Sequence, residues 1–335
     1  MPFCQIAAIS SYVPERVLDN DALAALYPEW SAAKIFEKTG IRERRIADEG
    51  QTSLDLAERA AQALWAEHGI DPAEIDFLLF CTQTPDYFLP TSACVLQQRL
   101  GLRRNCGALD INLGCSGFVY GLSLAKALIE SGQAGKVLLL TADTYSKLIH
   151  PQDKSVRTLF GDGASATLIS TSANDAAALG PFVFGTDGSG ANELIVPTGG
   201  FRRREAAGES EAEDESGNIR GPANLYMNGP AIMAFTLTEV PAAIRALLDR
   251  AGLTLEQIDY FVFHQANRFI LDALRKKLKI PPEKFVIWME DIGNTVSSTI
   301  PIALSKTKDA WEPGRRVMLV GFGGGYSWCA GLATI

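Results

Sequence analysis

One stretch of the chain occurs twice, and this repeat constrains the fold more than any other feature. Residues 69–81 (GIDPAEIDFLLFC) can be laid over residues 252–264 (GLTLEQIDYFVFH), with Gly, Ile, Asp and Phe recurring at one fixed offset. A stretch of helical periodicity precedes each copy, Leu56–Trp65 and Val240–Leu248. Each copy therefore predicts a helix that ends at a glycine, then a short connection and a buried strand. Any two α/β units share some likeness, but two related halves explain the match better.

A second, looser repeat involves glycine-rich segments. Residues 160–169 (FGDGASATLI) resemble residues 322–331 (FGGGYSWCAG). Each follows an apolar run, Val137–Leu140 at some distance and Val317–Val320 directly. Strands that alternate with helices predict sheets whose faces are covered by helices, with ligands gathering at the strand ends.

The repeats divide the chain into two parts without an obvious linker. We expect one compact pseudo-symmetric unit of two halves, residues 1–172 and 173–335, with the seam near Ser170–Gly180. Residues 202–220 differ in character, because they are rich in Arg and Glu and have almost no apolar side chains. Such a run is usually solvated, so we predict a mobile surface insertion there, with contact to a partner as the less favoured alternative.

Composition excludes several classes of protein. With 335 residues, 47% of them hydrophobic and 21% charged, the chain is typical of soluble proteins with a sizeable core. Its apolar runs, such as Phe77–Cys81, are far shorter than the roughly 20 residues that cross a bilayer, and the start lacks the basic region of a signal peptide. We expect no membrane span and a cytoplasmic location. A net charge of −8 disfavours nucleic-acid binding, and the six cysteines lack the paired spacing of disulfides or metal sites.

Three polar residues follow expected strands and form a candidate catalytic set. Cys115, in DINLGCSGFVYG, lies where a short strand turns into an apolar helix, and a helix N-terminus favours the thiolate. His264, in HQAN, follows the strand-like run Ile258–Phe263, and Asn294, in GNT, follows the apolar run Phe285–Trp288. A Cys, a His and an Asn at strand ends indicate nucleophilic catalysis. For Cys115 alone, a small buried hydrophobe is an equally good interpretation.

Taken in order, these motifs resemble the thiolase superfamily, and most closely the β-ketoacyl-[acyl-carrier-protein] synthase III family. The matching motifs are GCSGF around Cys115, FGDGA from Phe160, HQAN from His264, GNT around Asn294 and FGGGYSW from Phe322. The early segments ISSYVPER and TGIRER fit as well, so the resemblance covers nearly the whole chain. It implies an α/β, thiolase-like fold of five layers, αβαβα, built from two pseudo-symmetric halves and usually found as a homodimer.

The resemblance implies a two-step condensation that needs no cofactor and no metal. Cys115 would first take an acyl primer from a thioester, such as acyl-coenzyme A, as a covalent intermediate. Malonyl acyl carrier protein would then lose carbon dioxide, with His264 and Asn294 as hydrogen-bond donors to the enolate. The N–H groups of Cys115 and Gly324 would stabilise the oxyanion. The expected function is that of an acyltransferase, a condensing enzyme of fatty acid or related biosynthesis.

Substrate contacts are assigned from the resemblance alone. Asn267 and Gly229 would contact the pantetheine arm. Lys154 stands where relatives commonly have an arginine, and Lys34 where many have a tryptophan that stacks on the adenine of coenzyme A. An ammonium group cannot replace a stacking plane, so coenzyme A and a carrier protein both stay open as the acyl donor. Leu89 matches a position that reaches across the dimer into the partner's acyl pocket, with packing in its own loop as the alternative.

Basic side chains follow the His264 motif on an expected helix. Arg268, Arg275 and Lys276 would dock an acyl carrier protein, because such carriers are acidic. Cations near the C-terminus of a helix also stabilise its dipole, which is the alternative for Lys276.

Other functions compete with this interpretation. A degradative thiolase would carry a second catalytic cysteine just before the C-terminal glycine-rich turn, where this chain has none; Cys329, a few residues later, is expected in the core. A Cys/His/Asn hydrolase leaves the internal repeat unexplained. Two alternatives stay open: transfer of the acyl group from Cys115 to an oxygen or nitrogen nucleophile, and a non-catalytic subunit that binds acyl chains or carrier protein. The intact catalytic set argues against the second.

Overall fold

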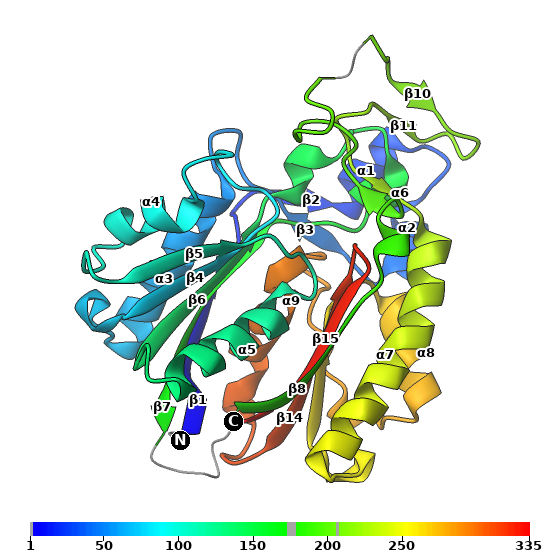
Figure 1. Ribbon diagram of the computed structural model, residues 1–335. Helices are drawn as coiled ribbons and strands as arrows, with labels where there is room; N and C mark the ends of the chain where they lie inside the picture. The colour runs from blue at the N-terminus through cyan, green and yellow to red at the C-terminus, as the bar shows by residue number, and fades with distance from the viewer. Residues whose placement is uncertain (1–2, 173–178, 206–207) are drawn as a thin grey trace.

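Two sheets form the centre of the molecule, as the computed structural model shows for residues 3–172, 179–205 and 208–335 (Figure 1). The first sheet has the strand order β1-β7-β6-β4-β5. Its strands are β1 Phe3–Tyr12, β4 Phe77–Cys81, β5 Gly107–Ile111, β6 Lys136–Asp143 and β7 Gly163–Ser172. The second sheet has the order β13-β14-β15-β8. Its strands are β8 Leu179–Thr186, β13 Tyr260–Phe263, β14 Arg316–Gly323 and β15 Ser327–Thr334.

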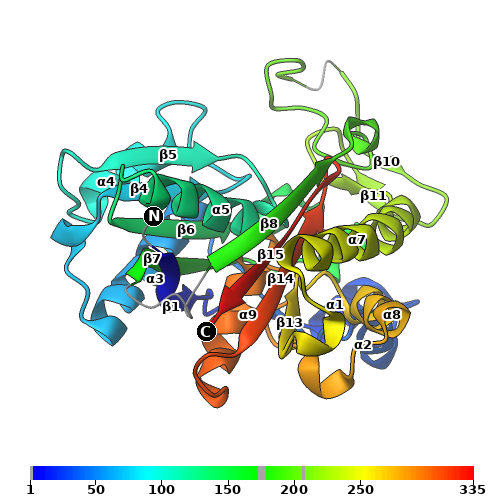
Figure 2. The same ribbon diagram turned by 60° about the horizontal axis from the view of Figure 1, so that its bottom comes forward.

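Helices form three layers around the two sheets. On the outer face of the first sheet lie α3 (Ser53–His68) and α4 (Ser92–Arg99), which pack on its strands. Between the sheets lie α5 (Gly117–Glu130) and α9 (Thr299–Thr307), each in contact with strands of both sheets (Figure 2). Outside the second sheet lie α7 (Gly229–Ala251) and α8 (Arg268–Leu278). The predicted αβαβα arrangement of five layers is thereby confirmed.

The local elements of the sequence repeat match in the structure. The helices α3 and α7 end at Gly69 and Gly252, each with φ 64° in the left-handed region that glycine adopts without strain. A 3₁₀ turn follows in both copies, and then the buried strand β4 or β13. Each strand pairs in parallel with the next long strand, β6 or β14, which in turn pairs antiparallel with β7 or β15. The expected seam between residues 172 and 173 borders residues 173–178, which lie outside the described part of the chain.

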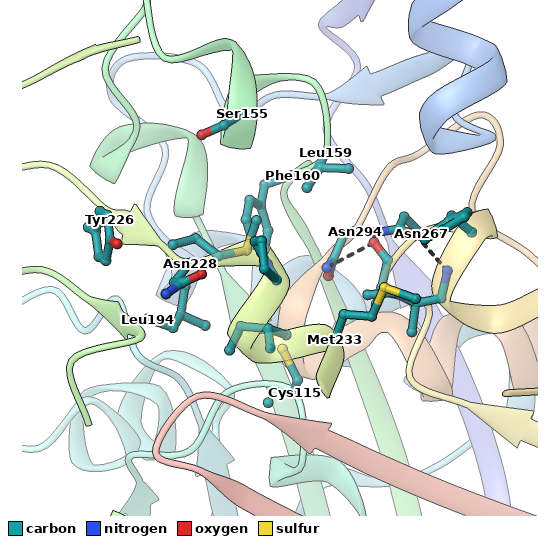
Figure 3. Close-up of a pocket in the computed structure, with 18 of the residues that line it drawn as sticks. Cys115, Ser155, Leu159, Phe160, Leu194, Tyr226, Asn228, Met233, Asn267 and Asn294 are labelled. Atoms are coloured by element: carbon teal, nitrogen blue, oxygen red, sulfur yellow. Dashed lines mark hydrogen bonds between the residues drawn. The ribbon is translucent and has the colours of Figure 1, made fainter. Parts of the chain in front are cut away.

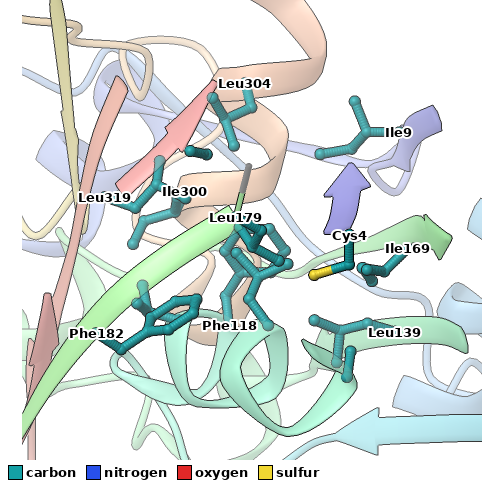
Figure 4. Packing of buried hydrophobic residues seen from close by; sticks show 14 of the residues in the cluster. Cys4, Ile9, Phe118, Leu139, Ile169, Leu179, Phe182, Ile300, Leu304 and Leu319 are labelled. Atoms are coloured by element: carbon teal, nitrogen blue, oxygen red, sulfur yellow. The ribbon is translucent and has the colours of Figure 1, made fainter. Parts of the chain in front are cut away.

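The middle layer is held by apolar packing from both sheets (Figure 4). Phe118 and Leu122 of α5 and Ile300 of α9 are fully buried there, together with Leu139 of the first sheet and Leu319 of the second. Each such side chain contributes roughly 1.5–3 kcal/mol relative to an exposed position. The start of α5, next to Cys115, is therefore fixed against both sheets.

One expected strand does not form. In the run Phe285–Trp288, the structure has only an isolated bridge between Phe285 and Phe261, and Trp288 stays 43% exposed. The N–H of Trp288 donates to the side chain of Gln265 instead of a neighbouring strand. Asn294 is therefore not at a strand end, which corrects the prediction from sequence.

The insertion expected at residues 202–220 also differs from a fully solvated run; residues 206–207 lie outside the described part. A short hairpin of β10 (Ala212–Glu213) and β11 (Ile219–Arg220) forms within it. Asn218 is buried, and Arg220 donates to the carboxylates of Asp153 and Asp214, each at 2.8 Å. These polar partners replace the apolar contacts that the run lacks, so its second half is fixed to the body of the protein.

Helix α7 is long and apolar enough, by length and composition, to cross a membrane. Half of its most apolar 18-residue stretch is buried in the structure, where α7 packs on β8, β14 and β15. A helix with a face buried in this way has the pattern of a core helix.

Candidate active site

A cavity of about 630 Å³ opens at the ends of the central strands and holds all three members of the candidate catalytic set. Its lining includes Cys115, Phe160, Leu194, Met227, Met233, His264, Ala266, Asn267, Ile270, Asn294, Phe322 and Gly323. In Figure 3, Cys115 lies at one end, Asn294 and Asn267 lie on one side, and Leu194, Asn228 and Tyr226 lie on the other. A ligand that enters this cavity can therefore reach the thiol.

The end of β14 packs directly against Cys115, which lies between the end of β5 and the start of α5. A Cβ on Gly323 would lie 2.8 Å from Cβ and 3.1 Å from Sγ of Cys115. A Cβ on Gly321 would lie 2.7 Å from Cα of Ser116. Only glycine allows these approaches. Gly324, the expected oxyanion donor, follows Gly323 and lies against Leu194.

The surroundings of Cys115 favour the neutral thiol. Burial, and then the nearby carboxyl of Asp143, raise the pKa of Cys115 to about 12. No cationic side chain contributes among the causes of this shift. The neutral thiol differs from the thiolate that was expected from the helix N-terminus.

His264 lies at the end of β13, where its N–H donates to the carbonyl of Val320 at 2.8 Å. Burial lowers the pKa of His264 to about 3, so the imidazole is neutral at ordinary pH. Nδ1 lies 2.7 Å from Oγ1 of Thr299, which is also 3.1 Å from the carbonyl of Val296. The single hydroxyl proton can go to only one of them, so Thr299 can support either tautomer and leaves Nε2 for the substrate.

Asn294 is oriented by backbone groups on both sides. Its Nδ2 donates to the carbonyl of Ala266 at 3.3 Å, and its Oδ1 accepts from the N–H of Val296 at 2.9 Å. Its backbone pairs with the segment Leu159–Gly161. One N–H of the amide is therefore left for a ligand in the cavity.

The two expected pantetheine contacts line the cavity, and Lys154 does not. Gly229 is the first residue of α7, and Asn267 is the N-cap of α8, where its side chain accepts from the N–H of Ile270 at 2.9 Å. Lys154, in α6 (Lys154–Arg157), pairs with Glu29 at 2.6 Å, and its neighbour Ser155 lines the cavity instead.

The remaining residues predicted for substrate contact or docking lie at the surface. Leu89 is 79% exposed and borders a second hollow that Phe88 and Phe201 also line. On α8, Arg268 and Arg275 both pair with Asp272, and Lys276 is exposed. Cys329 is buried in β15, as expected for a core residue.

Sequence reasoning missed two groups of residues at the site. Thr299, the partner of His264, belongs to the run of hydroxyl residues 297–299, which precedes an apolar helix and could have been noticed. Asp214, Asn218 and Arg220 line another part of the same cavity, the outer cavity. They belong to the segment that was expected to be solvated. Among the described residues, no group of three or more His, Cys, Asp or Glu side chains is placed to hold a metal ion.

Comparison with known proteins gives a consistent result across the chain. A family model described as 3-oxoacyl-[acyl-carrier-protein] synthase III matches residues 109–188, and the model of its C-terminal part matches residues 248–335. The β-ketoacyl-[acyl-carrier-protein] synthases III of Caldanaerobacter subterraneus and Lactococcus lactis are each 36% identical, over 97% and 98% of this chain and 96% and 98% of theirs.

Solved structures agree with these relatives. The crystal structure of a 3-oxoacyl-(acyl-carrier-protein) synthase III superposes with a TM-score of 0.98 at 58% identity, covering 100% of both chains. A 3-oxoacyl-(acyl-carrier protein) synthase from Burkholderia xenovorans gives a TM-score of 0.91 at 40% identity, covering 99% of this chain and 94% of that one.

Proposed function

The chain belongs to the 3-oxoacyl-[acyl-carrier-protein] synthase III family, and from this premise we propose that its reaction runs through Cys115, His264 and Asn294. The protein is an acyltransferase, a condensing enzyme of fatty acid biosynthesis. The observation that carries the residue assignment is that all three side chains line one cavity. Family membership favours condensation over transfer to an oxygen or nitrogen nucleophile, and over a non-catalytic subunit.

In the first step, Sγ of Cys115 attacks the carbonyl carbon of an acyl thioester. The bond from Sγ to the acyl carbon forms, the bond to the carrier sulfur breaks, and the thiol proton ends on the departing carrier thiol. A base is needed because Cys115 is held as a thiol. Neutral His264 can accept the proton at Nε2 when its Nδ1–H donates to Thr299.

In the second step, a malonyl thioester loses carbon dioxide. The electron pair of the broken bond forms an enolate, whose oxygen accepts from Asn294 Nδ2 and from His264. For His264 to donate through Nε2–H, its ring proton has to exchange from Nδ1 to Nε2 between the two steps, and the Thr299 hydroxyl then donates to the bare Nδ1. The enolate carbon then attacks the acyl carbon on Cys115. The N–H groups of Cys115 and Gly324 stabilise the oxyanion until Sγ leaves as the thiolate and takes a proton.

The outer cavity suits a pantetheine arm, with Gly229 and Asn267 on its wall. We propose that an acyl carrier protein brings the malonyl group and docks on α8 through Arg268, Arg275 and Lys276. The exposed position of Lys276 supports this assignment. Lys154 pairs with Glu29 and is the neighbour of Ser155 in the cavity wall, so its contact with pantetheine stays a prediction. The reaction uses thioesters, a thiol and hydrogen-bond donors, so we propose that it needs no cofactor. A homodimer and a cytoplasmic location stay predictions.

Intact-protein mass measurement tests the nucleophile. Purified protein is incubated with a panel of acyl-coenzyme A and acyl carrier protein donors, beside the Cys115→Ala variant. A mass gain of one acyl group, absent in the variant, is expected, and the donor that loads fastest identifies the primer. Malonyl carrier protein is then added to the loaded enzyme. Loss of the acyl mass together with a 3-oxoacyl product supports condensation, while a folded protein that no donor loads would contradict the proposal.

Docking is tested by charge reversal on α8. Lys276→Glu is expected to raise the KM for malonyl carrier protein several-fold and to leave the KM for malonyl-coenzyme A unchanged, because only the protein substrate carries an acidic surface. The matched control is Lys306→Glu, an exposed lysine on α9. Equal effects of the two variants on carrier protein would place docking elsewhere.

A further inference from the structure

A buried carboxyl that takes no part in the chemistry above lies close to Cys115. Asp143, the last residue of β6, is fully buried and faces three hydrogen-bond donors. The N–H of Gln83 donates to Oδ1 at 2.8 Å, and both the N–H and the hydroxyl of Ser297 donate to Oδ2. The two oxygens of one carboxyl thus join two loops that are far apart in the sequence. A buried carboxyl is costly unless it is bonded in this way.

The loop on the Oδ2 side carries the residues that orient two members of the catalytic set. Ser297 lies between Val296, whose N–H donates to Asn294, and Thr299, whose hydroxyl contacts His264. Val296 has φ 56°, a left-handed conformation that is strained for a β-branched residue and persists only where its surroundings hold it. The two hydrogen bonds that Ser297 donates to Asp143 hold the residue that follows this strained position.

The loop on the Oδ1 side packs against the turn of the nucleophile. The side-chain carbonyl of Gln83 accepts a hydrogen bond from the hydroxyl of Tyr145. A Cβ on Gly114, the residue before Cys115, would lie 2.3 Å from this same oxygen. Gln83 therefore limits where the turn that carries Cys115 can lie, and its own backbone is fixed by Asp143.

We propose that Asp143 is a positioning residue that sets the Cys115 turn against the Asn294–Thr299 segment, with one carboxyl oxygen holding each side. This inference rests on the proposed roles of Cys115, His264 and Asn294. Asp143 acts on them through Gln83 and Ser297 and does not itself touch the substrate.

The negative charge of Asp143 makes the thiol of Cys115 less acidic, although the hydrogen bonds of Asp143 help to position that thiol. Its carboxyl raises the pKa values of Cys115, Cys81 and Tyr145, the titratable groups around it. Burial, with a further contribution from Asp162, raises the pKa of Asp143 itself to about 7. Removing the charge should therefore make Cys115 more acidic, while removing the hydrogen bonds should make its placement worse. The first effect should speed up the alkylation of Cys115, and the second should lower kcat for condensation.

The variant Asp143→Asn removes the charge together with one hydrogen-bond acceptor, and two different measurements report the two effects. Asn has nearly the same shape, but its NH₂ group cannot accept from the donors of Gln83 or Ser297. We expect kcat for condensation to fall about 10- to 100-fold, as misplaced reacting groups do, with the KM for malonyl carrier protein changed less than about twofold. Alkylation of Cys115 by iodoacetamide, followed by peptide mass measurement from pH 6 to 10, should become faster at neutral pH. A purely structural role would not lower kcat and speed up alkylation together.

Asp162→Asn is the matched control. Asp162 is equally buried and also accepts from two backbone N–H groups and a serine hydroxyl, those of Ala47 and Ser146. We expect a similar loss of melting temperature, a much smaller loss of kcat and unchanged alkylation of Cys115. If both variants lose kcat in proportion to their stability, or if Asp143→Asn slows alkylation, the positioning role is overturned.

Two further measurements keep the test decisive. Ser297→Ala removes only the hydroxyl bond to Oδ2. It should lower kcat less than Asp143→Asn does and leave alkylation unchanged, so it tests the proposal even if Asp143→Asn fails to fold; unchanged kcat in a folded Ser297→Ala protein would count against it. The wild-type condensation assay reports the proposed function separately. If the wild type condenses no substrate, that function fails, while the alkylation comparison still tests the coupling of Asp143 to Cys115.

Discussion

A histidine without an acidic partner can be buried only as the neutral imidazole. His264 meets this condition, because its ring contacts the hydroxyl of Thr299 and packs T-shaped with the ring of Phe322, and burial alone accounts for its lowered pKa. The neutral form is also the one that the proposed reaction needs, since an imidazolium could not take the proton of Cys115. Burial of this one residue therefore sets its protonation state for catalysis, and it lowers the free energy of unfolding at low pH.

This effect gives a prediction for stability against pH. The pKa of His264 is about 3 in the folded protein and near 6.5 when unfolded, so the unfolded chain binds the proton more readily. The contribution of neutral His264 is full above about pH 6.5 and is lost as pH falls toward 3, at about 1.4 kcal/mol per unit. Between pH 7.5 and 5, wild type should lose about 2 kcal/mol more unfolding free energy than His264→Gln, measured by urea titration. Equal losses would show that His264 is charged or solvated in the folded state.

At the residue level, sequence patterns identified the candidate catalytic set but not what orients it. Cys115 and His264 follow strands, and their neighbouring small and polar residues form recognisable motifs. Thr299 stands in a recognisable run of hydroxyl residues, but its role depends on the contact with distant His264. Asp143 carries no local signal at all, because it acts through Ser297, which is distant in the chain. A side chain whose role depends on a long-range contact is visible only once the fold has brought its partner close.

At the level of elements, the approach of β14 to the start of α5 decides where the nucleophile can lie. Gly321 and Gly323 let the strand backbone touch the Cys115 turn. A methyl group at Gly321 would lie 2.7 Å from the Cα of Ser116 and 2.8 Å from the carbonyl oxygen of Cys115, both backbone atoms that cannot rotate away. Either the strand or the helix start would have to move.

Gly321→Ala should therefore lower activity more than its effect on stability explains. We expect a stability loss of about 1–3 kcal/mol from overpacking and a fall in kcat of about 100-fold, as for displaced reacting groups. The measurements are a melting curve and a steady-state condensation assay. Gly50→Ala is the control, because no atom lies within 4 Å of a Cβ placed there and its φ is not positive. Full activity in Gly321→Ala would show that the turn tolerates displacement.

The hairpin of β10 and β11 borders the outer cavity, and Arg220 attaches it to the body of the protein through Asp153. The guanidinium bonds two carboxylates and lies 5.3 Å above the ring of Tyr226. Arg220→Gln leaves the buried carboxylate of Asp153 without its cation, which should cost about 1–3 kcal/mol. We expect faster proteolysis within the hairpin and a several-fold higher KM for the carrier thioester, with kcat nearly unchanged. The control is Arg315→Gln, a more exposed arginine that also pairs with two acids.

Regular elements were predictable where local sequence and tertiary contacts agree. The repeated unit of helix, glycine cap and strand has all its signals in neighbouring residues, and both copies form as predicted. The run Phe285–Trp288 has strand-like composition, yet it pairs with β13 at only one position, because Trp288 bonds a side chain instead. The charged insertion is fixed by the pair of Arg220 with Asp153, which is distant in the chain, and composition alone could not indicate this contact.

At the scale of the whole molecule, several large apolar side chains are exposed to solvent. Tyr87, Phe88 and Leu89 are each more than 60% exposed in one loop. The ring centroids of Phe88 and of the exposed Phe201 lie 5.6 Å apart. Strand β5 is the edge of the first sheet, and its Leu109 is also exposed. Exposed apolar patches and open sheet edges usually mark an interface with another chain. These observations support the proposed homodimer, in which β5 and the Tyr87–Leu89 loop would lie at the interface.

Charge placed in this loop should therefore disrupt the dimer. Leu89→Asp would put a carboxylate into an apolar interface, where a buried unpaired charge is strongly unfavourable. We expect wild type to sediment as a dimer at micromolar concentration and Leu89→Asp to shift toward monomer, with condensing activity that rises with protein concentration. Leu26→Asp is the matched control, because Leu26 is a similarly exposed leucine on α1 (Asn20–Leu26), away from this loop. If wild type is monomeric, or if both variants dissociate equally, the apolar loop serves another contact.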